Sequence, residues 1–283
     1  EVPDHRIYDL AAMFKPKKTT PAFTRFVDIA GLVAGASKGE GLGNQFLSHI
    51  RETDAIAHVV RCFEDGNITH VEGSIDPVRD MDIINTELCL ADLESVDKKK
   101  TKTAKLAQAG IKQAKADLPV LEKVYDALQN GTPARALTLS DDDLEVLKEL
   151  NLITLKPVLY VLNMAEDDIA DPLANEYVQA ASKEAEKEGA KWVPISAEIE
   201  EEVSELDGEE AKAFLADLGE EEPGLNRLIR TAYSMLGLIN FFTVGSDECR
   251  SWTVRAGTKA PKAAGKIHSD IERGFIRAEI VSY

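Results

Sequence analysis

The sequence predicts an α/β protein whose largely parallel sheet is interrupted by an inserted pair of long helices. Three short apolar runs, residues 55–62, 157–163 and 192–196, are typical of buried strands. Helical patterns separate these runs, and this alternation builds a mostly parallel sheet. From about residue 84 to residue 151 the alternation stops, because no strand pattern occurs there. We therefore expect an α/β domain with a helical insertion.

The chain first predicts a strand over residues 22–29, AFTRFVDI, in which Asp28 is the only acid. Five glycines follow between residues 31 and 43, and a helix is expected over residues 43–53 because its apolar residues fall at helical spacing. The run AIAHVVRC, residues 55–62, is apolar enough for a strand that is covered on both faces. Asp28 thus ends an apolar strand and precedes a segment rich in glycine.

The insertion predicts two helices that form an antiparallel hairpin. Gly110 interrupts the first helical pattern, and a second pattern continues through Pro119. The expected tip is basic, because residues 98–115 contain seven lysines and no acid in a chain of formal net charge −17. These lysines are Lys98, Lys99, Lys100, Lys102, Lys105, Lys112 and Lys115. A solvated helix face and an RNA-binding surface both explain the pattern.

The remaining chain predicts two more helices and a smaller C-terminal unit. The helices are expected near residues 173–189 and 222–236. The segments FFTVG (241–245) and SWTVRAG (251–257) have the β-propensity of a hairpin. The acidic residues between 198 and 222 are expected to form solvated helices.

Composition limits the partners that the protein can have. A net charge of −17 should repel DNA and anionic membranes, so we expect neither as a partner, and RNA only through a local basic patch. No apolar run approaches the ~18 residues of a membrane span. Three cysteines that lie far apart fit a reducing, cytoplasmic compartment. A chain of 283 residues is long enough for two or three units.

Three short polar patterns follow expected strands and mark a candidate nucleotide site. They are D-x-x-G, from Asp28 to Gly31; NMAE, residues 163–166; and the pair Ser196 and Ala197. Open α/β sheets bind ligands at the carboxyl ends of their strands. Each pattern is weak alone, since Asp28 could cap a turn and Asn163 could cap a strand end. The order and spacing of the three patterns, each at the end of an expected strand, together predict the nucleotide site.

The first pattern suits phosphate chemistry. In nucleotide hydrolases the acid of D-x-x-G reaches the Mg²⁺ shell through a water molecule, and the glycine amide senses the γ-phosphate. Asp28 and Gly31 are therefore the expected catalytic pair, with Mg²⁺ as the cofactor.

The other two patterns suit a nucleotide base. GTPases use N-K-x-D, whereas here Met164 replaces the lysine and Glu166 replaces the aspartate after Asn163. The longer carboxylate sits differently, so guanine specificity should weaken. Adenine also offers a hydrogen-bond donor where guanine offers an acceptor, so exchanging the base reverses the sense of the hydrogen bond. Ser196 and Ala197 would present backbone amides to the base.

The chain resembles, nearly residue for residue, the Obg-like ATPases called YchF. The resemblance includes FVDIAGLVAGASKGEGLGNQFLSHIRETDAIAHVVRCF, NTELCLADLE, NMAE, LGEEEPGLNRLI and AAGKIHSDIERGFIRAE. It implies a P-loop NTPase G domain with a coiled-coil insertion and a C-terminal, β-grasp-like TGS domain. It also implies hydrolysis of ATP in preference to GTP, association with the ribosome and its RNA, and a nucleotide-dependent switch in translation or stress response.

The resemblance assigns roles to individual residues. The positions that match the family's site are Asp28, Gly31, Leu32, Asn163, Met164, Glu166, Ser196 and Ala197. Leu32 stands where Ras-like GTPases carry a glutamine that orients water, so intrinsic hydrolysis should be slow unless another group replaces it. His49 and His58 are candidates for that group, although a structural role explains each of them more simply.

One motif of the family is missing. No G-x-x-x-x-G-K-[ST] pattern occurs in the sequence, so we expect the chain to lack its P-loop segment, and part of its TGS domain, and to bind ATP weakly in this form. The expected parts are the first part of the G domain (1–84), the insertion (85–151), the second part (152–238) and a partial TGS domain (239–283).

Two alternative functions remain. The chain could be an RNA-binding module that does not depend on nucleotide, with Lys98, Lys99, Lys100, Lys102 and Lys105 contacting ribosomal RNA. It could also be a conventional GTPase, which a comparison of ATP and GTP affinities would reveal.

Overall fold

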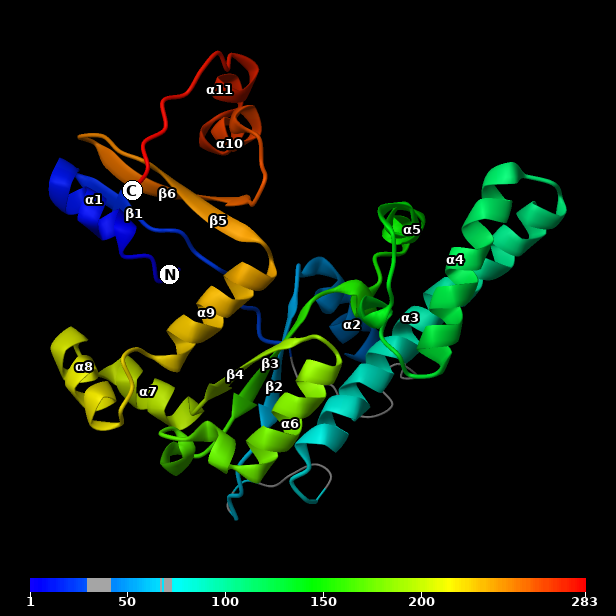
Figure 1. Ribbon diagram of the computed structural model, residues 1–283, viewed down its shortest axis with the longest axis horizontal. Helices are drawn as coiled ribbons and strands as arrows, with labels where there is room; N and C mark the ends of the chain where they lie inside the picture. The colour runs from blue at the N-terminus through cyan, green and yellow to red at the C-terminus, as the bar shows by residue number, and fades with distance from the viewer. Residues whose placement is uncertain (30–41, 67, 69–72) are drawn as a thin grey trace. The chain divides into compact units, whose positions relative to one another are not determined.

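The computed structural model describes residues 1–29, 42–66, 68 and 73–283 (Figure 1). These residues divide into two compact units. One comprises residues 28–220, and the other comprises residues 1–27 together with 221–283. Gly31 and Leu32 lie outside the described residues.

Within the described residues, the larger unit contains a parallel sheet of three strands in the order β2-β3-β4. The strands are β2 (Ile56–Arg61), β3 (Val158–Asn163) and β4 (Lys191–Ile195), and each pair is parallel. The three apolar runs that predicted strands are therefore confirmed. Pro194 is accommodated because β4 lies at the edge of the sheet.

Helices complete the larger unit. They are α2 (Leu42–Glu52), α3 (Pro77–Gln108), α4 (Lys112–Gln129), α5 (Asp141–Leu147), α6 (Glu176–Lys187), α7 (Ala197–Glu205) and α8 (Gly208–Asp217). Short 3-10 helices are η2 (Ala134–Ala136), η3 (Lys148–Leu150), η4 (Ile153–Leu155), η5 (Glu166–Asp168) and η6 (Pro172–Ala174). The largest core cluster packs Tyr160 and Leu162 of β3 against Val178 and Ala181 of α6.

The two faces of the sheet are not covered equally. All residues of β3 from Val158 to Leu162 are buried, as expected for a central strand. In β2, however, Val59 is 64% exposed, and Ala57 is exposed as well. The prediction that residues 55–62 are covered on both faces is therefore wrong, because alternate side chains of this edge strand have no described element over them.

The strand expected over residues 22–29 is also absent. These residues are described, and none of them belongs to a strand. Phe23 and Phe26 are 65% and 46% exposed. A strand needs a hydrogen-bonded neighbour, and this segment pairs with no other strand in the described part of the chain, so apolar composition alone did not make it one.

The expected hairpin is formed by α3 and α4, which lie side by side (Figure 1). Asp76 caps α3 by accepting a hydrogen bond from Arg79 N at 3.0 Å, and Pro77 fits the first turn. Gly110 has a φ of +88°, a left-handed conformation that favours glycine, and it turns the chain between the helices. Leu121, Val124 and Leu128 of α4 supply the core of the hairpin.

A fully buried carboxylate fixes the chain that returns from the hairpin. Asp92 of α3 has no exposed surface and accepts hydrogen bonds from Ile153 N (3.1 Å), Thr154 N (2.7 Å) and Thr154 Oγ1 (2.7 Å). Arg51 Nη2 lies 3.4 Å from its Oδ1. Burial raises the pKa of Asp92, while the hydrogen bonds from Thr154 and Ile153 oppose that effect. One side chain thus anchors η4 to the hairpin.

A second polar cluster, the Arg135 cluster, joins the hairpin to the sheet. It consists of Arg135, Asn85, Tyr160 and Glu188. Arg135 Nη2 donates to Asn85 Oδ1 (2.8 Å) and to Glu188 Oε2 (3.0 Å). Asn85 Nδ2 and Tyr160 Oη donate to the Glu188 carboxylate at 2.8 and 3.1 Å. Burial, followed by the charge of Glu188, raises the pKa of Tyr160 to about 12. Four separate segments therefore meet around one ion pair.

The smaller unit contains a second sheet, in the order β1-β6-β5. Its elements are α1 (Arg6–Phe14), β1 (Lys18–Thr20), α9 (Gly224–Met235), β5 (Leu238–Thr243), β6 (Glu248–Arg255), α10 (Ala260–Ile267) and α11 (Ser269–Arg273). The antiparallel pair β5 and β6 confirms the expected hairpin. Residues 1–27 belong here, and not with residues up to 84 as expected, because β1 pairs with β6. Among the described helices, none is long and apolar enough to cross a lipid bilayer.

Candidate functional site

Two of the three polar patterns meet at one end of the sheet. The register of β3 and β4 places Asn163 beside Ile195, so the residues after both strands emerge together. Asn163 Oδ1 accepts a hydrogen bond from Ala197 N at 2.9 Å, and Met164 N donates to Ile195 O at 2.9 Å. The structure thus joins the 163–166 loop to the 196–197 loop.

The side chains in these loops differ in access. Ala197 is exposed, whereas Met164 is 2% exposed and packs in the main core cluster. Met164 therefore cannot replace the lysine stem that would pack on a base, and only its backbone can face a ligand. Ser196 is 1% exposed, and its Oγ has no hydrogen-bond partner in the described part of the chain. Such a buried polar atom is rare and marks a site that a water or ligand group can complete.

The two carboxylates expected at the site, Glu166 and Asp28, differ in their surroundings. Glu166 is partly buried and begins the turn η5. Asp28 is exposed in an irregular segment. Neither side chain forms an ion pair or hydrogen bond with the rest of the described chain. Gly31, the expected partner of Asp28, is outside the described residues.

Asn175, which precedes α6, is not among the residues that the sequence patterns indicated. Its Oδ1 accepts from Tyr177 N (2.8 Å) and Val178 N (3.1 Å), and its Nδ2 donates to Cys62 O (3.0 Å) and Asp168 Oδ2 (2.7 Å). An asparagine directly before a helical pattern is a helix-start signal, and that signal could have identified its capping role. The two contacts made by Nδ2 are not visible in the sequence.

Arg61 organises the segment that follows β2. Its guanidinium donates to three carbonyl oxygens, Phe63 O (3.0 Å), Ile68 O (3.0 Å) and Asp65 O (3.3 Å). It also lies 4.7 Å from the centre of the Phe63 ring. The segment after β2 therefore wraps around one side chain at the same sheet end as Asn163, its register partner.

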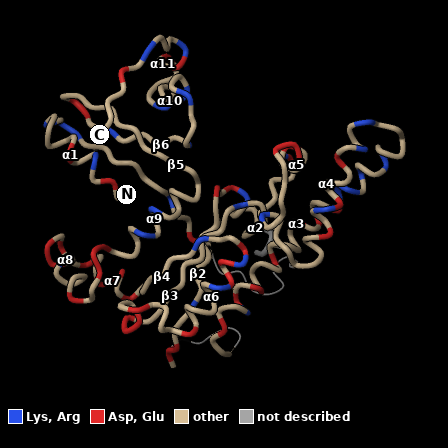
Figure 2. Tube along the Cα trace, viewed as in Figure 1, with Lys and Arg blue, Asp and Glu red and all other residues tan. Residues whose placement is uncertain are grey.

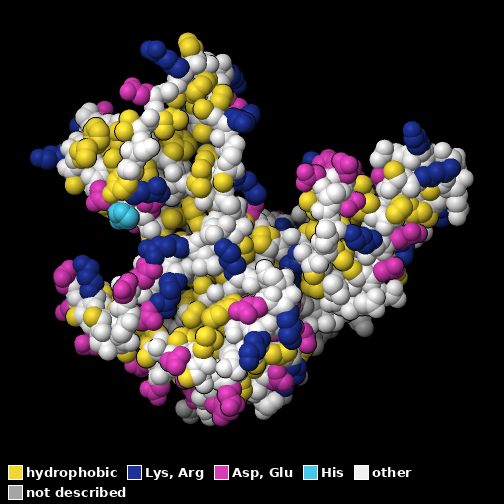
Figure 3. Space-filling model, viewed as in Figure 1, with side chains coloured by type: hydrophobic (Ala, Val, Ile, Leu, Met, Phe, Trp, Pro, Cys, Tyr) yellow, Lys and Arg dark blue, Asp and Glu magenta, His cyan; other side chains and the backbone are white. Residues whose placement is uncertain are grey.

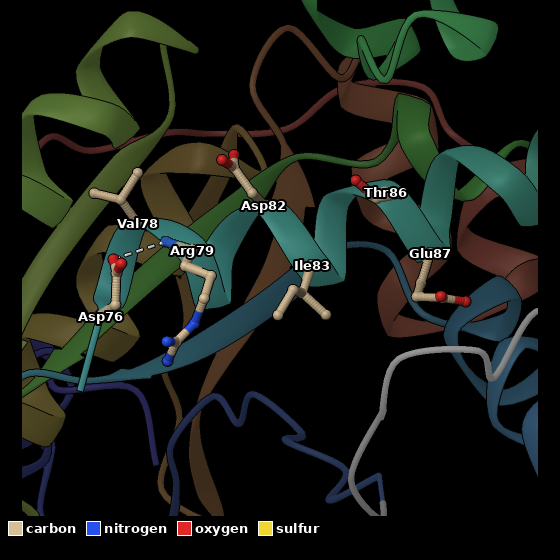
Figure 4. Close-up of a pocket in the computed structure, with 7 residues that line it drawn as sticks. All are labelled: Asp76, Val78, Arg79, Asp82, Ile83, Thr86 and Glu87. Atoms are coloured by element: carbon tan, nitrogen blue, oxygen red, sulfur yellow. Dashed lines mark hydrogen bonds between the residues drawn. The ribbon is translucent and has the colours of Figure 1, made fainter. Parts of the chain in front are cut away.

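A separate pocket of about 560 Å³ lies along the first turns of α3 (Figure 4). Its lining residues are Asp76, Val78, Arg79, Asp82, Ile83, Thr86 and Glu87. Burial, and then the charges of Glu184 and Glu188, raise the pKa of Asp82. Three carboxyl groups in the lining would repel a phosphate, so the pocket does not suit the polyphosphate of a nucleotide.

His58, a candidate for activating water, has contacts that fit a structural role. It is partly buried, and its ring centre lies 5.4 Å from that of Tyr160. Burial, and then the charge of Arg135, lower the pKa of His58 to about 4. His58 is therefore neutral at physiological pH, and its ring lies beside that of Tyr160 on the neighbouring strand β3.

The lowered pKa of His58 predicts a pH dependence of stability. Between pH 6.5 and about 4 the unfolded chain binds the proton more readily than the folded chain, so acidification favours unfolding. We expect His58 to cost the protein up to about 3 kcal/mol of stability across this range. Urea unfolding of wild type and His58→Gln at several pH values measures the difference. Parallel curves for the two proteins would contradict the assignment.

The lysines of the hairpin divide into two groups. Lys98 pairs with Glu94 at 2.5 Å and Lys99 pairs with Glu149 at 2.8 Å. Lys100 lies 3.5 Å from Asp97 and 2.9 Å from the centre of the Tyr125 ring. Three of the five lysines expected to contact RNA thus already have intramolecular partners.

The other group, the tip lysines, lies around Gly110 and comprises Lys102, Lys105, Lys112 and Lys115. All four are exposed and form no salt bridge with any part of the chain that the structure describes. Figures 2 and 3 show Lys and Arg residues gathered at the outer end of the α3–α4 hairpin. Leu106 and Ile111, 39% and 46% exposed, lie among them.

Comparison with protein families gives two matches. A family described as "50S ribosome-binding GTPase" matches residues 11–87. The C-terminal family of YchF GTPases, described as a protein of unknown function, matches residues 238–283.

Individual relatives match along the whole chain. The "Ribosome-binding ATPase YchF" of Bacillus subtilis is 51% identical over 283 residues, which cover 100% of this chain and 77% of the relative. The protein of the same name from Haemophilus influenzae is 52% identical over 282 residues, with coverage of 100% and 77%. The "Structure of the Schizosaccharomyces pombe YchF GTPase" superposes with a TM-score of 0.86 at 42% identity, covering 97% of this chain and 74% of that chain. The α/β fold with its parallel sheet is thus that of a P-loop G domain, and the chain belongs to the YchF family.

Proposed function

We propose that this protein is a ribosome-associated nucleotide hydrolase that binds ATP in preference to GTP. The observation that carries the proposal is the hydrogen bond from Ala197 N to Asn163 Oδ1, which joins the two loops expected to hold the base. The bacterial relatives are named ribosome-binding ATPases, and the fission yeast structure is titled a GTPase. Base preference is therefore the property to test first.

The geometry supports a division of roles. Asn163 braces the 196–197 loop, so that Ala197 and the buried Ser196 Oγ lie beside the base. Glu166 supplies the carboxylate that accepts from the adenine amino group. Asn163 and Ala197 are positioned by strands, which makes their placement more precise than that of a loop.

The phosphate end of the site involves Asp28. Its carboxylate is exposed and forms no hydrogen bond or ion pair with the described chain, so it is accessible to a hydrated metal ion. Bound Mg²⁺ would neutralise phosphate charge, and Asp28 would contact its hydration shell through a water molecule. No G-x-x-x-x-G-K-[ST] motif occurs in the 283 residues, so we expect these residues alone to hold the phosphates weakly and to hydrolyse ATP poorly. We also propose that the protein acts as a nucleotide-dependent switch and that it is located in the cytoplasm.

Glu166→Asp tests the base preference. Shortening the carboxylate should favour guanine, and the ratio of the ATP to the GTP dissociation constant should rise about tenfold. Titration with fluorescent ATP and GTP analogues and Mg²⁺ measures both constants. Met164→Lys is not suitable as a companion change, because it would bury an ammonium group in the core.

Asp167→Asn is the matched control, since Asp167 is exposed on the same turn. Its ratio should equal that of the wild type. An unchanged ratio in Glu166→Asp would contradict the role of Glu166, and failure of the wild type to bind either nucleotide would contradict the proposed hydrolase.

A second proposed function is RNA contact through the tip lysines. Their exposure, and the absence of a salt bridge to any described residue, favour them over Lys98, Lys99 and Lys100. Replacing all four tip lysines by alanine should weaken binding to ribosomal RNA and reduce the slope of log affinity against log salt by about 2 to 3. The triple variant Lys98→Ala, Lys99→Ala, Lys100→Ala is the control and should change the slope much less. Equal effects of the two variants would contradict the assignment.

A further inference from the structure

Asn175 makes four hydrogen bonds, which is an unusually complete set for one amide. Its oxygen accepts from the backbone amides of Tyr177 and Val178, as an N-cap does. Its nitrogen donates to Cys62 O at 3.0 Å and to Asp168 Oδ2 at 2.7 Å. Both donors and both acceptor positions of the amide are therefore used.

These bonds connect three segments. Cys62 follows β2, and its own amide donates to Asn163 O at 2.7 Å. Asp168 is the last residue of the turn η5, which Glu166 begins. Asn175 itself starts α6. One side chain thus links the end of β2, the turn that carries Glu166, and a helix packed in the core.

The turn has few other restraints. Met164 and Ile169 are buried, at 2% and 6% exposure, and hold its two ends in the core. Between them, Asp168 N donates to Ala165 O at 3.3 Å and Ile169 N donates to Glu166 O at 3.1 Å, so both bonds lie within the turn. The Asp168 carboxylate is the side-chain group that joins the described turn to another segment through a hydrogen bond.

We infer that Asn175 and Asp168 form a positioning pair that sets the place of the Glu166 carboxylate and thereby the base preference. The inference rests on the proposed nucleotide site, because the pair is inferred to hold the Glu166 carboxylate in place within that site. Misplacement of a binding group by about 1 Å can lower the rate of a reaction up to about 100-fold. The pair touches no base itself and acts only through the turn.

The pair offers a variant that cuts the link and keeps the helix cap. Asn175→Asp retains the oxygen that accepts from Tyr177 and Val178, and aspartate is as good an N-cap as asparagine. It loses both donors and places a second carboxylate against Asp168, so the two charges repel. Adding Asp168→Asn returns a donor to the contact, with donor and acceptor exchanged.

Two measurements test the inference. Amide hydrogen exchange of residues 165–169 reports how firmly the turn is held, without any nucleotide. Asn175→Asp should accelerate that exchange, and the double variant Asn175→Asp, Asp168→Asn should restore it toward the wild-type rate. Titration with fluorescent ATP and GTP analogues then gives the base preference, which should fall about tenfold in Asn175→Asp and recover in the double variant.

The matched control is Asp207→Ala, which removes the N-cap of α8 in the same unit. It should destabilise the protein without changing the ATP to GTP ratio, because α8 carries none of the site residues. Unchanged exchange in Asn175→Asp would overturn the positioning role. Accelerated exchange with an unchanged ratio would overturn the link to base preference. Absence of nucleotide binding in the wild type would overturn the proposed function and the link together, while exchange would still decide whether the pair positions the turn.

Discussion

Glu188→Leu is expected to destabilise the larger unit by about 3–5 kcal/mol. Arg135 and Glu188 have only 10% and 16% of their side chains exposed, and their charges compensate each other. Without Glu188 the guanidinium is a buried charge that retains Asn85 as its acceptor, while Arg135 Nε and Nη1 already lack partners in the described chain. Urea unfolding followed by tryptophan fluorescence measures the loss.

A double substitution separates the cost of a broken pair from the value of the pair. Arg135→Met with Glu188→Leu replaces both charges by apolar groups and should recover most of the lost stability. Glu145→Leu is the surface control, because Glu145 and Lys148 form an ion pair with both side chains 71% exposed and its loss should change little. If the double variant were as unstable as Glu188→Leu, the loss would come from packing and not from the unpaired charge.

Asp92→Ala is expected to cost about 3–5 kcal/mol as well. The substitution removes the acceptor of three hydrogen bonds, from Ile153 N, Thr154 N and Thr154 Oγ1, in a place that water cannot reach. It also leaves the Arg51 guanidinium without its carboxylate. Denaturant unfolding gives the loss, and hydrogen exchange at residues 151–156 should show the return segment opening first.

Asp92→Asn tests whether the charge or the acceptor matters. Asparagine keeps one oxygen acceptor but loses the charge, so its cost should be clearly smaller than that of alanine. Equal losses in the two variants would show that the carboxylate charge, and not the hydrogen bonds, fixes η4.

Apolar runs predicted the central part of the fold well. Residues 157–163 became the fully buried strand β3, because continuous apolar sequence is what a central parallel strand requires. Residues 22–29 also predicted a strand but form none, since strand formation depends on a neighbour that local sequence does not specify. This segment also contains Thr24, Arg25 and Asp28, so it is less continuously apolar than β3.

Polar interactions over long sequence distances could not be predicted. Arg135 is 50 residues from Asn85 and 53 from Glu188, and no local pattern connects these positions. For the same reason the contact between Lys99 and Glu149, 50 residues away, could not be predicted from the sequence. The proximity of Asn163 and Ala197 could be predicted from the sequence, because both lie where expected parallel strands end, and the carboxyl ends of such strands share one edge of the sheet.

The helix α3 has a mechanical consequence. It runs without proline or glycine from its second residue, Val78, to Gln108, so its 32 residues span about 48 Å as one stiff rod. Asn85, close to its start, is bonded to Tyr160 of the sheet, and its far end carries two of the tip lysines. A tilt of about 10° at the first turn would displace the last turn by about 8 Å over that length. Because α3 is one continuous helix, any tilt at its sheet end would be carried along its whole length to the tip lysines.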